Sequence, residues 1–524
     1  MQSDQLVMTT VTDNLKDLPA AGADTAVAIS TPGGKPLTYA GLRSLIAQSV
    51  QTLNALGVGR NDRVAIVLDN GPEMATCFLA SASGCTAAPL NPTYRAEEFE
   101  FYLTDLRAKL LIVEAGKHTP AIDVARKLGV AIAELTPTPD AAAGTFGLTK
   151  RDQAGPTAAT LKGGYAAADD IALVLHTSGT TSRPKIVPLS QRNVCASAGN
   201  VRGTLALTAV DRGLNIMPLF HIHGLIAGLL APLSAGSEVC CTPGFNALHF
   251  FRWMAEARPT WYTVVPTMHQ TILSRAAKNA DVIRANPLRF IRSSSSALPP
   301  QVIRELEETF GAPLIESYGM TEAAHQMASN PLPPSVRKPG SVGRAAGPEV
   351  GIMDSAGNLL PPGATGEIVI RGPNVTKGYE NNPGANGEAF TNGWFRTGDQ
   401  GVMDAEGYVS ITGRLKEIIN RGGEKISPRE VDDVLMDHPA VQQVVTFAVP
   451  HDKLGEDVGA AVVLREGATA TDKELREFCA QRLAQFKVPR TIVFLAEIPK
   501  GATGKLQRIG LAQKLGLARD AQRR

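Results

Sequence analysis

The sequence has few cysteines, no long apolar run and almost no net charge, and each of these absences excludes something. Its six cysteines form no C-x-x-C pair and no metal-ligand spacing, which argues against a zinc site and favours a reducing compartment. No apolar stretch reaches the ~18 residues that would suggest a membrane span. The 52 Lys and Arg residues nearly balance 50 Asp and Glu residues, so we expect neither a nucleic-acid surface nor a polybasic membrane anchor.

The ends of the chain carry no recognisable targeting signal. The start, Met1-Gln-Ser-Asp-Gln, is polar and lacks the profile of a signal peptide, and the end, Leu517–Arg524, is not a peroxisomal tripeptide. We therefore expect a cytoplasmic protein. The sequence leaves the oligomeric state open between a monomer and a homodimer.

The length of 524 residues is too great for one core, so we expect at least two domains. Short apolar runs such as Arg63–Leu68 and Lys109–Glu114 predict buried strands, and the periodicity of Leu37–Gly57 and Pro72–Ser83 predicts helices. This alternation continues to about residue 330 and indicates a parallel sheet covered by helices. The aperiodic stretch Thr136–Lys162, rich in Pro, Thr and Gly, predicts a long surface connection.

The composition changes twice after residue 330. Gly, Pro and short strands dominate from about residue 340, which predicts a small β-rich module. After Gly413-Arg414 a compact α+β segment follows, with a helix at Pro428–Asp437 and strands at Val441–Pro450 and Gly459–Leu464. We therefore expect an α/β protein, with a large N-terminal domain (residues 1–413) of helix-covered sheets plus the β-rich module, and a small α+β C-terminal domain (residues 414–524).

One polar loop, Thr177-Ser-Gly-Thr-Thr-Ser-Arg-Pro-Lys185, lies between the apolar run Ile171–Leu175 and a helix-like segment after Pro188. Small residues, hydroxyls, backbone N–H groups and one cation are the groups that hold a polyphosphate. The loop is not a Walker A motif, because Pro184 rather than glycine precedes its lysine. Taken alone, it could equally be a polar turn between two elements.

Further motifs follow this loop in a fixed order. They are Pro218-Leu-Phe-His-Ile-His-Gly224, Glu316-Ser-Tyr-Gly-Met-Thr-Glu322, Gly393-Trp-Phe-Arg-Thr-Gly-Asp399, Gly413-Arg-Leu-Lys-Glu-Ile-Ile419, Arg421-Gly-Gly-Glu-Lys-Ile426 and Pro499-Lys-Gly-Ala-Thr-Gly-Lys505. In this order the series resembles the adenylate-forming superfamily of acyl-CoA synthetases, luciferases and nonribosomal peptide adenylation domains, from about residue 25 to 510. The loop departs from the family pattern at Ser182 and Ile186, which replace two glycines.

The resemblance implies a reaction in two steps that uses ATP, Mg²⁺ and coenzyme A. A carboxylate attacks the α-phosphate of ATP and gives an acyl-adenylate and pyrophosphate. A thiol, expected to be that of coenzyme A, then attacks the acyl carbon and releases AMP. The resemblance also implies that the C-terminal domain rotates between the two steps, with the hinge near Lys416.

The resemblance assigns roles to several residues. Lys505 orients the carboxylate and the α-phosphate, and Glu322, after Thr321, binds Mg²⁺ together with Thr180. Tyr318 offers a flat face to adenine. The other nucleotide or coenzyme A contacts are expected at Thr177, Ser178, Gly179, Thr181, Lys185, Ser296, Glu316, Ser317, Gly319, Asp399 (ribose hydroxyls), Arg414 (ribose or phosphate), Lys416, Gly422 and Gly423.

The stretches Ala323–Pro334 and Arg337–Gly343 look like those of the oxalate–CoA ligase branch, and less closely like those of malonate–CoA ligases. A second carboxylate in the substrate needs its own donors, because a buried unpaired anion costs several kcal/mol. We expect His325, Ser294 and His221 to supply them, with His223 as a weaker candidate, although His325 could instead cap a helix. A ligase for malonate or another short or aromatic acid, or a module that loads a carrier protein, remains an alternative.

Overall fold

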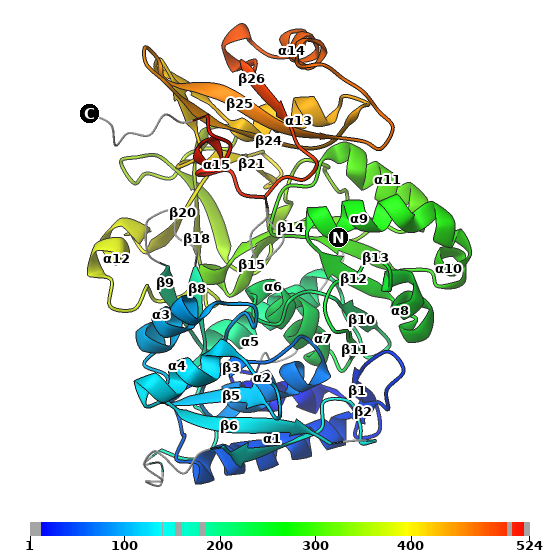
Figure 1. Cartoon of the computed structure of the whole chain (residues 1–524), viewed down its shortest axis with the longest axis vertical. Helices are drawn as coiled ribbons and strands as arrows, with labels where there is room; N and C mark the ends of the chain where they lie inside the picture. The colour runs from blue at the N-terminus through cyan, green and yellow to red at the C-terminus, as the bar shows by residue number, and fades with distance from the viewer. Residues whose placement is uncertain are drawn as a thin grey trace, which may run out of the picture.

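The computed structural model in Figure 1 describes residues 12–138, 140–151, 160, 162–177, 184–499 and 506–517. These residues form four sheets with helices packed between and around them. The largest buried apolar cluster joins the first two sheets, since Leu173 of one strand and Val239 of another share it with Leu42 of a helix. The first 330 residues are therefore layered α/β structure, as the sequence predicts.

The first sheet has seven strands in the order β7-β6-β5-β3-β4-β8-β9. Its inner strands are parallel, and the edge strands β7 and β9 pair antiparallel with their neighbours. In chain order the strands are β3 (Arg63–Val67), β4 (Thr86–Pro89), β5 (Leu110–Glu114), β6 (Ala131–Pro137), β7 (Phe146–Lys150), β8 (Ile171–Thr177) and β9 (Lys185–Ser190).

One prediction for this region is wrong, and another is confirmed. Residues 136–162 are not one long connection, because β6 runs to Pro137 and β7 pairs with it. The helix expected after Pro188 is present, but β9 precedes it and forms a hairpin with β8, in which Thr177 lies opposite Lys185. Helix α5 (Gln191–Thr204) begins after it, with Ser190 as its N-cap. Edge strands as short as β7 carry too few residues for their alternation to be recognised in the sequence.

The second sheet has nine strands in the order β16-β15-β14-β13-β12-β10-β11-β1-β2. The strands from β14 to β1 are parallel, while β15, β16 and β2 are antiparallel additions at the two edges. They are β1 (Val27–Ser30), β2 (Leu37–Thr38), β10 (Arg212–Asn215), β11 (Glu238–Cys241), β12 (Trp261–Val264), β13 (Phe290–Ser293), β14 (Leu314–Met320), β15 (His325–Ser329) and β16 (Arg344–Ala345). The carboxyl ends of parallel strands meet at one edge of a sheet, where ligands of α/β proteins usually bind.

Two smaller sheets complete the described residues. An antiparallel sheet holds β17 (Glu349–Met353), β18 (Thr365–Arg371), β19 (Phe390–Thr391), β20 (Trp394–Met403) and β21 (Val409–Arg414). The C-terminal sheet, orange to red at the top of Figure 1, holds β22 (Ile419–Arg421), β23 (Glu424–Ile426), β24 (Val441–His451), β25 (Gly455–Leu464) and β26 (Thr491–Phe494). The β-rich module and the α+β segment are therefore present where the sequence predicts them.

The predicted helix over residues 37–57 is confirmed as α1, with the Thr38 side chain accepting a hydrogen bond from the N–H of Gly41 and with Gly57, at φ 82°, just past its end. The α-helices are α1 (Tyr39–Ala55), α2 (Pro72–Gly84), α3 (Ala96–Leu106), α4 (Pro120–Leu128), α5, α6 (Ile222–Leu225), α7 (Ala231–Leu233), α8 (Phe250–Ala257), α9 (Pro266–Ala276), α10 (Ala280–Ala285), α11 (Pro300–Phe310), α12 (Pro383–Ala389), α13 (Pro428–Met436), α14 (Asp472–Ala480) and α15 (Leu511–Lys514).

One predicted helix, over residues 222–234, contains a π-helical turn at Ile226–Leu230 between α6 and α7. The side chain of Asn215 accounts for it. Its amide donates to the carbonyl of Gly224, and a Cβ on Gly228 would lie 2.7 Å from its Oδ1. A polar side chain pressed against a helix in this way widens the turn, and such turns are frequent at functional sites.

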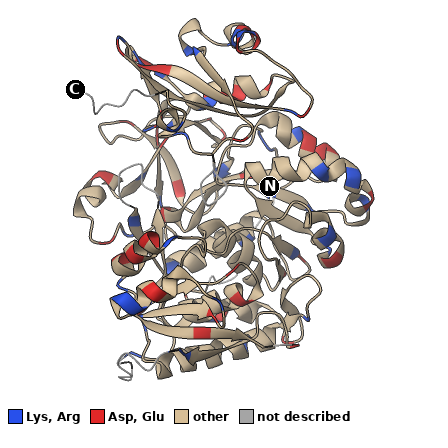
Figure 2. Cartoon of the chain, in the orientation of Figure 1, with Lys and Arg blue, Asp and Glu red and all other residues tan. Residues whose placement is uncertain are grey.

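All six cysteines are free and buried, as expected of thiols rather than ligands, and burial raises the pKa of Cys77 to about 12. Within the described residues, every helix is too short or too polar to cross a membrane. Figure 2 shows acidic and basic residues interspersed along the chain rather than gathered by sign at one end, which agrees with the small net charge.

Candidate active site

Glu322 lies just past the end of β14, in a short 3₁₀ turn over Thr321–Ala323. Its carboxylate is buried and accepts a hydrogen bond of 2.8 Å from the hydroxyl of Tyr379. The ammonium of Lys185 lies 4.4 Å from the centre of the Tyr379 ring. Burial raises the pKa of Glu322, and the Tyr379 hydroxyl, Arg414 and Lys185 oppose that rise. The motif after β14 and the end of the polar loop therefore meet around Tyr379, which the sequence did not single out.

Asp399 provides a second buried carboxylate nearby. It accepts hydrogen bonds from the hydroxyl of Tyr318 at 2.5 Å and from Nε of Arg414 at 2.9 Å. Burial is the main cause that raises the pKa of Tyr318, so its hydroxyl keeps its proton and donates it. Asp399 thus links three of the predicted nucleotide contacts, although they come from β14, β20 and β21.

We call these residues the nucleotide-side cluster: Lys185, Tyr318, Glu322, Tyr379, Asp399 and Arg414. The cluster fits Mg²⁺ only together with a phosphate ligand. Within the described part of the chain, no group of three or more His, Cys, Asp or Glu residues is arranged to hold a metal. Mg²⁺ is commonly bound by one or two carboxylates plus substrate phosphates and water. One buried carboxylate, Glu322, beside a phosphate-type loop is consistent with that arrangement.

Some predicted residues cannot be placed. Lys505 and the loop residues Ser178, Gly179, Thr180 and Thr181 lie outside the described residues, as does Ser182. Ile186, the other departure from the family loop, is buried in β9.

Other predicted nucleotide contacts have structural partners. Glu316 is buried and accepts from the N–H of Gly340, and burial raises its pKa to about 8. Ser317 donates to the carbonyl of Ser293 on the next strand. Ser296 is exposed on the segment after β13. These residues lie beside the motif strands, and nothing in their contacts singles them out as ligands.

The predicted coenzyme A contacts lie in the C-terminal segment. Gly422 and Gly423 form the turn between β22 and β23 with φ of 60° and 101°, conformations that favour glycine. The N–H of Gly422 donates to the carbonyl of Leu454 in the same segment. Lys416 is exposed in the connection between β21 and β22. The turn therefore contacts the C-terminal sheet. The roles of Gly422, Gly423 and Lys416 in coenzyme A binding and in a hinge stay predictions.

A second cluster lies on the other side of the β14–β15 turn. His223, on α6, is fully buried, with Nε2 2.6 Å from the Thr263 hydroxyl and Nδ1 3.2 Å from the Ser295 hydroxyl. His325, the first residue of β15, stacks on it with ring centres 4.9 Å apart. His325 therefore does not cap a helix, and His223 is more central than the sequence indicated.

Arg292, on the buried strand β13, contacts both histidines. Its Nη2 lies 3.0 Å from Nε2 of His325 and 3.3 Å from Oε1 of Gln326. Its Nη1 lies 3.2 Å from the Thr263 hydroxyl and 3.4 Å from Nε2 of His223. We call Arg292, His223, His325, Thr263, Ser295 and Gln326 the acyl-side cluster.

The other two expected carboxylate donors lie differently from His325. Ser294 is buried and its hydroxyl donates to the carbonyl of Ser317, so it links two strands; the neighbouring Ser295 is the serine that contacts the histidine pair. His221 caps the start of α6, where its Nδ1 accepts from the N–H of His223 at 3.3 Å. Ser295 is one of four consecutive serines, Ser293–Ser296, and the sequence does not show which of them contacts the histidines.

Gly319 brings the two clusters together. Strands β14 and β15 approach so closely that a Cβ on Gly319 would lie 1.7 Å from the carbonyl oxygen of His325. Only glycine permits this approach. In Figure 1, β14 and β15 lie between α6 and the C-terminal sheet.

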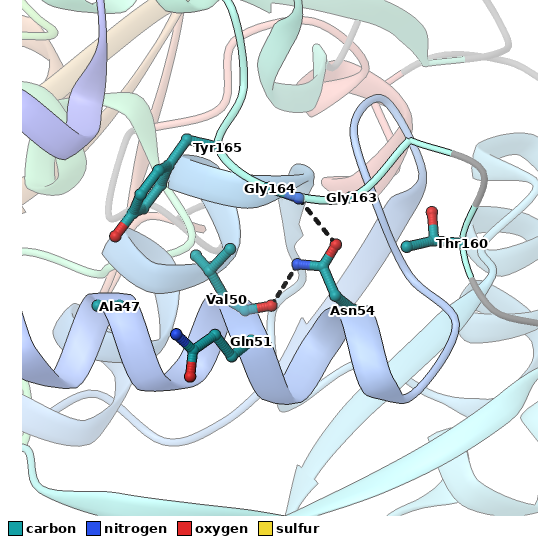
Figure 3. A pocket seen from close by; sticks show the side chains of 8 residues that line it. All are labelled: Ala47, Val50, Gln51, Asn54, Thr160, Gly163, Gly164 and Tyr165. Atoms are coloured by element: carbon teal, nitrogen blue, oxygen red, sulfur yellow. Dashed lines mark hydrogen bonds between the residues drawn. The ribbon is translucent and has the colours of Figure 1, made fainter.

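A groove of about 530 Å³ between α1 and the segment that holds Thr160 and Gly163–Tyr165 is separate from both clusters (Figure 3). In it the Asn54 amide donates to the carbonyl of Val50 and its oxygen accepts from the N–H of Gly164. These contacts tie the segment to α1, at the foot of the molecule in Figure 1.

The described geometry can be compared with known proteins. The chain matches the AMP-binding enzyme model over residues 18–380 and the model of the AMP-binding enzyme C-terminal domain over residues 430–505. It is 46% identical to the oxalate–CoA ligase of Arabidopsis thaliana, over 93% of this chain and 95% of that protein. It is 43% identical to the oxalate–CoA ligase of Saccharomyces cerevisiae, over 87% of each.

The fold is also similar to a solved structure, that of ATP-bound MatB from Rhodopseudomonas palustris. The TM-score is 0.85 at 30% identity, and the match covers 96% of this chain and 98% of that one. These similarities confirm the α/β fold and the resemblance that the ordered motifs suggested. The chain belongs to the family of AMP-binding enzymes.

Proposed function

We propose that this protein is an AMP-forming acid–CoA ligase whose acid substrate is oxalate. The observation that carries the proposal is the acyl-side cluster, in which two stacked histidines contact a buried arginine. One of these histidines, His325, begins the strand that follows the turn holding the buried carboxylate of Glu322. The similarity to two oxalate–CoA ligases over most of the chain supports the choice of acid. The cluster is polar and offers hydrogen-bond donors, which suits a small acid with two carboxylates.

In the first step, a carboxylate oxygen of the acid attacks the α-phosphorus of ATP, and the bond to the bridging oxygen of pyrophosphate breaks. Lys185 stabilises the phosphates that leave, and Lys505 stabilises the charge that develops at the α-phosphate. Mg²⁺, when bound at Glu322, would neutralise phosphate charge and orient the polyphosphate. Tyr318, Asp399 and Arg414 hold the nucleoside.

In the second step, the thiol of coenzyme A attacks the acyl carbon and AMP leaves. We propose that residues 414–524 form the mobile domain that changes position between the steps, with the hinge near Lys416. The exposure of Lys416 supports this, as does the turn at Gly422 and Gly423, because the N–H of Gly422 donates to Leu454 within the C-terminal segment. The proposed location is the cytoplasm, where six buried free thiols would stay reduced.

The test is release of AMP and pyrophosphate across a panel of acids, with oxalate, malonate, acetate and coumarate, in the presence of free coenzyme A. We expect oxalate to give the highest kcat/KM and to form one thioester per AMP. If another acid is preferred, the oxalate assignment is wrong and the ligase chemistry stands. If free coenzyme A does not release AMP from a formed adenylate, the alternative of carrier-protein loading replaces it.

A further inference from the structure

Arg292 is a fully buried arginine with no carboxylate partner. Within the described residues, no Asp or Glu forms a salt bridge with it, and its hydrogen bonds go to side chains that are neutral or histidine. Among the residues that the structure describes, its Nε has no hydrogen-bond partner. Burial lowers the pKa of Arg292 to about 9, which leaves the guanidinium charged at neutral pH. A buried charge without a partner is costly, so such an arginine calls for an explanation.

The guanidinium fixes the direction of every hydrogen bond around it, because it can only donate. Toward His325, its Nη2 donates to Nε2, so a neutral His325 carries its proton on Nδ1. The first chain of hydrogen bonds therefore runs from Arg292 to His325. It leaves the Nδ1–H of His325, on the ring edge opposite Arg292, as a hydrogen-bond donor.

The second chain of hydrogen bonds runs through Thr263. Arg292 Nη1 donates to the Thr263 oxygen, so the Thr263 hydroxyl is free to donate to Nε2 of His223 over 2.6 Å. His223 is then protonated on Nδ1 and donates to the Ser295 oxygen at 3.2 Å. The hydroxyl hydrogen of Ser295 is left to donate onward. Both chains of hydrogen bonds therefore start at the Arg292 guanidinium. One ends in the Nδ1–H of His325 and the other in the hydroxyl of Ser295.

Gln326 holds the guanidinium in place. Its Oε1 accepts from Arg292, while its amide nitrogen donates to the Thr204 hydroxyl at 3.0 Å and to the carbonyl of Ala346 at 3.1 Å. The amide orientation is thereby set on both sides. Because these contacts fix the Gln326 side chain, the guanidinium stays in contact with both histidines, and His223 links it to Ser295.

We propose that Arg292 is a positioning residue that selects a dianionic acid: it locks His223 and His325 in the Nδ1–H tautomer and supplies a positive charge that only the second carboxylate of the substrate compensates. The inference rests on the proposed function, and it adds a residue and a physical basis for choosing a dicarboxylate. Arg292 does not touch the reacting atoms. It acts through Ser295 and the two rings, at the range over which a buried charge is weakly screened.

The first experiment measures the tautomers directly in the unmodified enzyme. Histidine labelled with ¹⁵N reports which ring nitrogen carries the proton, and His223→Gln and His325→Gln assign two of the nine histidines. We expect both rings to carry the proton on Nδ1 in the unmodified enzyme. In Arg292→Met we expect a mixture of the Nδ1–H and Nε2–H tautomers. Nε2–H rings in the unmodified enzyme would overturn the proposal whatever acid the enzyme uses.

The second experiment compares oxalate with glyoxylate, which replaces the second carboxylate by an aldehyde. In Arg292→Met we expect kcat/KM for oxalate to fall about 30-fold or more and that for glyoxylate to change little, with KM for ATP within about 3-fold. Arg292→Lys, which keeps the charge but not the fork of donors, should retain part of the preference. An equal loss for both acids would mean a purely structural role and would overturn the proposal.

Arg289 provides the matched control. It lies just before the same strand and pairs with the buried Asp211 at 2.9 Å, and its hydrogen bonds within the described residues go to Asp211, Leu205 and Ala206. Arg289→Met should lower stability at least as much as Arg292→Met, yet leave the oxalate-to-glyoxylate ratio unchanged. If the unmodified enzyme rejects oxalate but accepts malonate, the oxalate assignment is wrong. The ratio of kcat/KM values is then measured for malonate against propionate, which lacks the second carboxylate. An enzyme that accepts only monocarboxylates would refute both ideas.

Discussion

The two clusters treat charge in opposite ways. On the nucleotide side, Glu322 and Asp399 are buried carboxylates, and Lys185 and Arg414 are cations close to them. On the acyl side, Arg292 is a buried cation with no carboxylate beside it among the described residues. The first cluster suits a ligand that brings both phosphates and a metal, and the second suits a ligand that brings only negative charge.

A short segment separates these environments. Glu322 and His325 are near neighbours in the chain, yet their side chains belong to different clusters. The backbone turns sharply between them, with Ala324 at φ 48° and His325 at φ 105°, conformations that residues other than glycine rarely adopt. Strained backbone of this kind is concentrated at functional sites, where the surrounding structure holds it.

Substitution of Glu322 should give the largest effect and should leave the choice of acid intact. Glu322→Gln is expected to slow adenylation about 10²–10³-fold, because a buried group that stabilises charge in the transition state is lost. Pyrophosphate exchange with titrated Mg²⁺ measures it. Glu380→Gln is the control, since Glu380 pairs with Arg63 instead. A rate within about 5-fold of the unmodified enzyme would show that this cluster does not hold the metal.

Gly319→Ala should damage both clusters together. The new Cβ would meet the main chain of His325, which cannot move aside as a side chain does. We expect the free energy of unfolding to fall by about 2–4 kcal/mol. We also expect oxalate turnover to be lost. Gly384→Ala, in α12, is the control, because its Cβ would meet nothing within 4 Å. Thermal unfolding of both variants checks the expectation, and equal unfolding temperatures would contradict it.

His325→Ala and Asp399→Asn should separate the clusters. His325→Ala is expected to raise KM for oxalate about 10-fold or more and to leave KM for ATP nearly unchanged, because it removes a donor to the acid. Asp399→Asn should do the reverse. Initial rates with each substrate varied in turn give both constants. An unchanged oxalate KM in His325→Ala would remove His325 from the acid site.

Glu316 should give the smallest effect, visible only as a pH dependence. Burial raises its folded pKa to about 8, so the folded state keeps a proton that the unfolded state releases above the usual value of 4.5. Its contribution is most favourable below pH 4.5 and is lost as the pH rises through 8. Glu316→Gln should therefore gain stability relative to the unmodified protein between pH 5.5 and 8.5.

Thermal unfolding at both pH values tests this, as the difference between variant and unmodified protein. The carboxylates Glu307 and Asp433 and the guanidinium of Arg429 also act on Glu316. Arg429→Gln should steepen the pH dependence, since it removes a cation that opposes the pKa rise. A difference between the proteins that does not vary with pH would contradict the expectation.

The order of the motifs and the periodicity of the long helices were enough to predict the family, the α/β fold and the C-terminal segment. These features depend on local residue patterns. In α1, for example, Thr38 caps the start of the helix and Gly57 lies just past its end. Tyr318 and Asp399 were each expected at the nucleotide because both lie in motifs, but the hydrogen bond between them was not predicted. The edge strands β7 and β9 were missed, since pairing with a neighbour, rather than their own sequence, makes them strands.

The acyl-side cluster was decided by the tertiary structure. Arg292 lies in the four-residue strand β13, which is buried on both faces, so no alternation marked its side chain as different from a surface arginine. Ser295 was one of four serines, and Tyr379 stood in no expected contact. The sequence determined which chemical groups the chain carries. Only the packing of β13, β14, β15 and α6 decided which of them share one buried site, because burial and partners, not residue type, set what a charge can do.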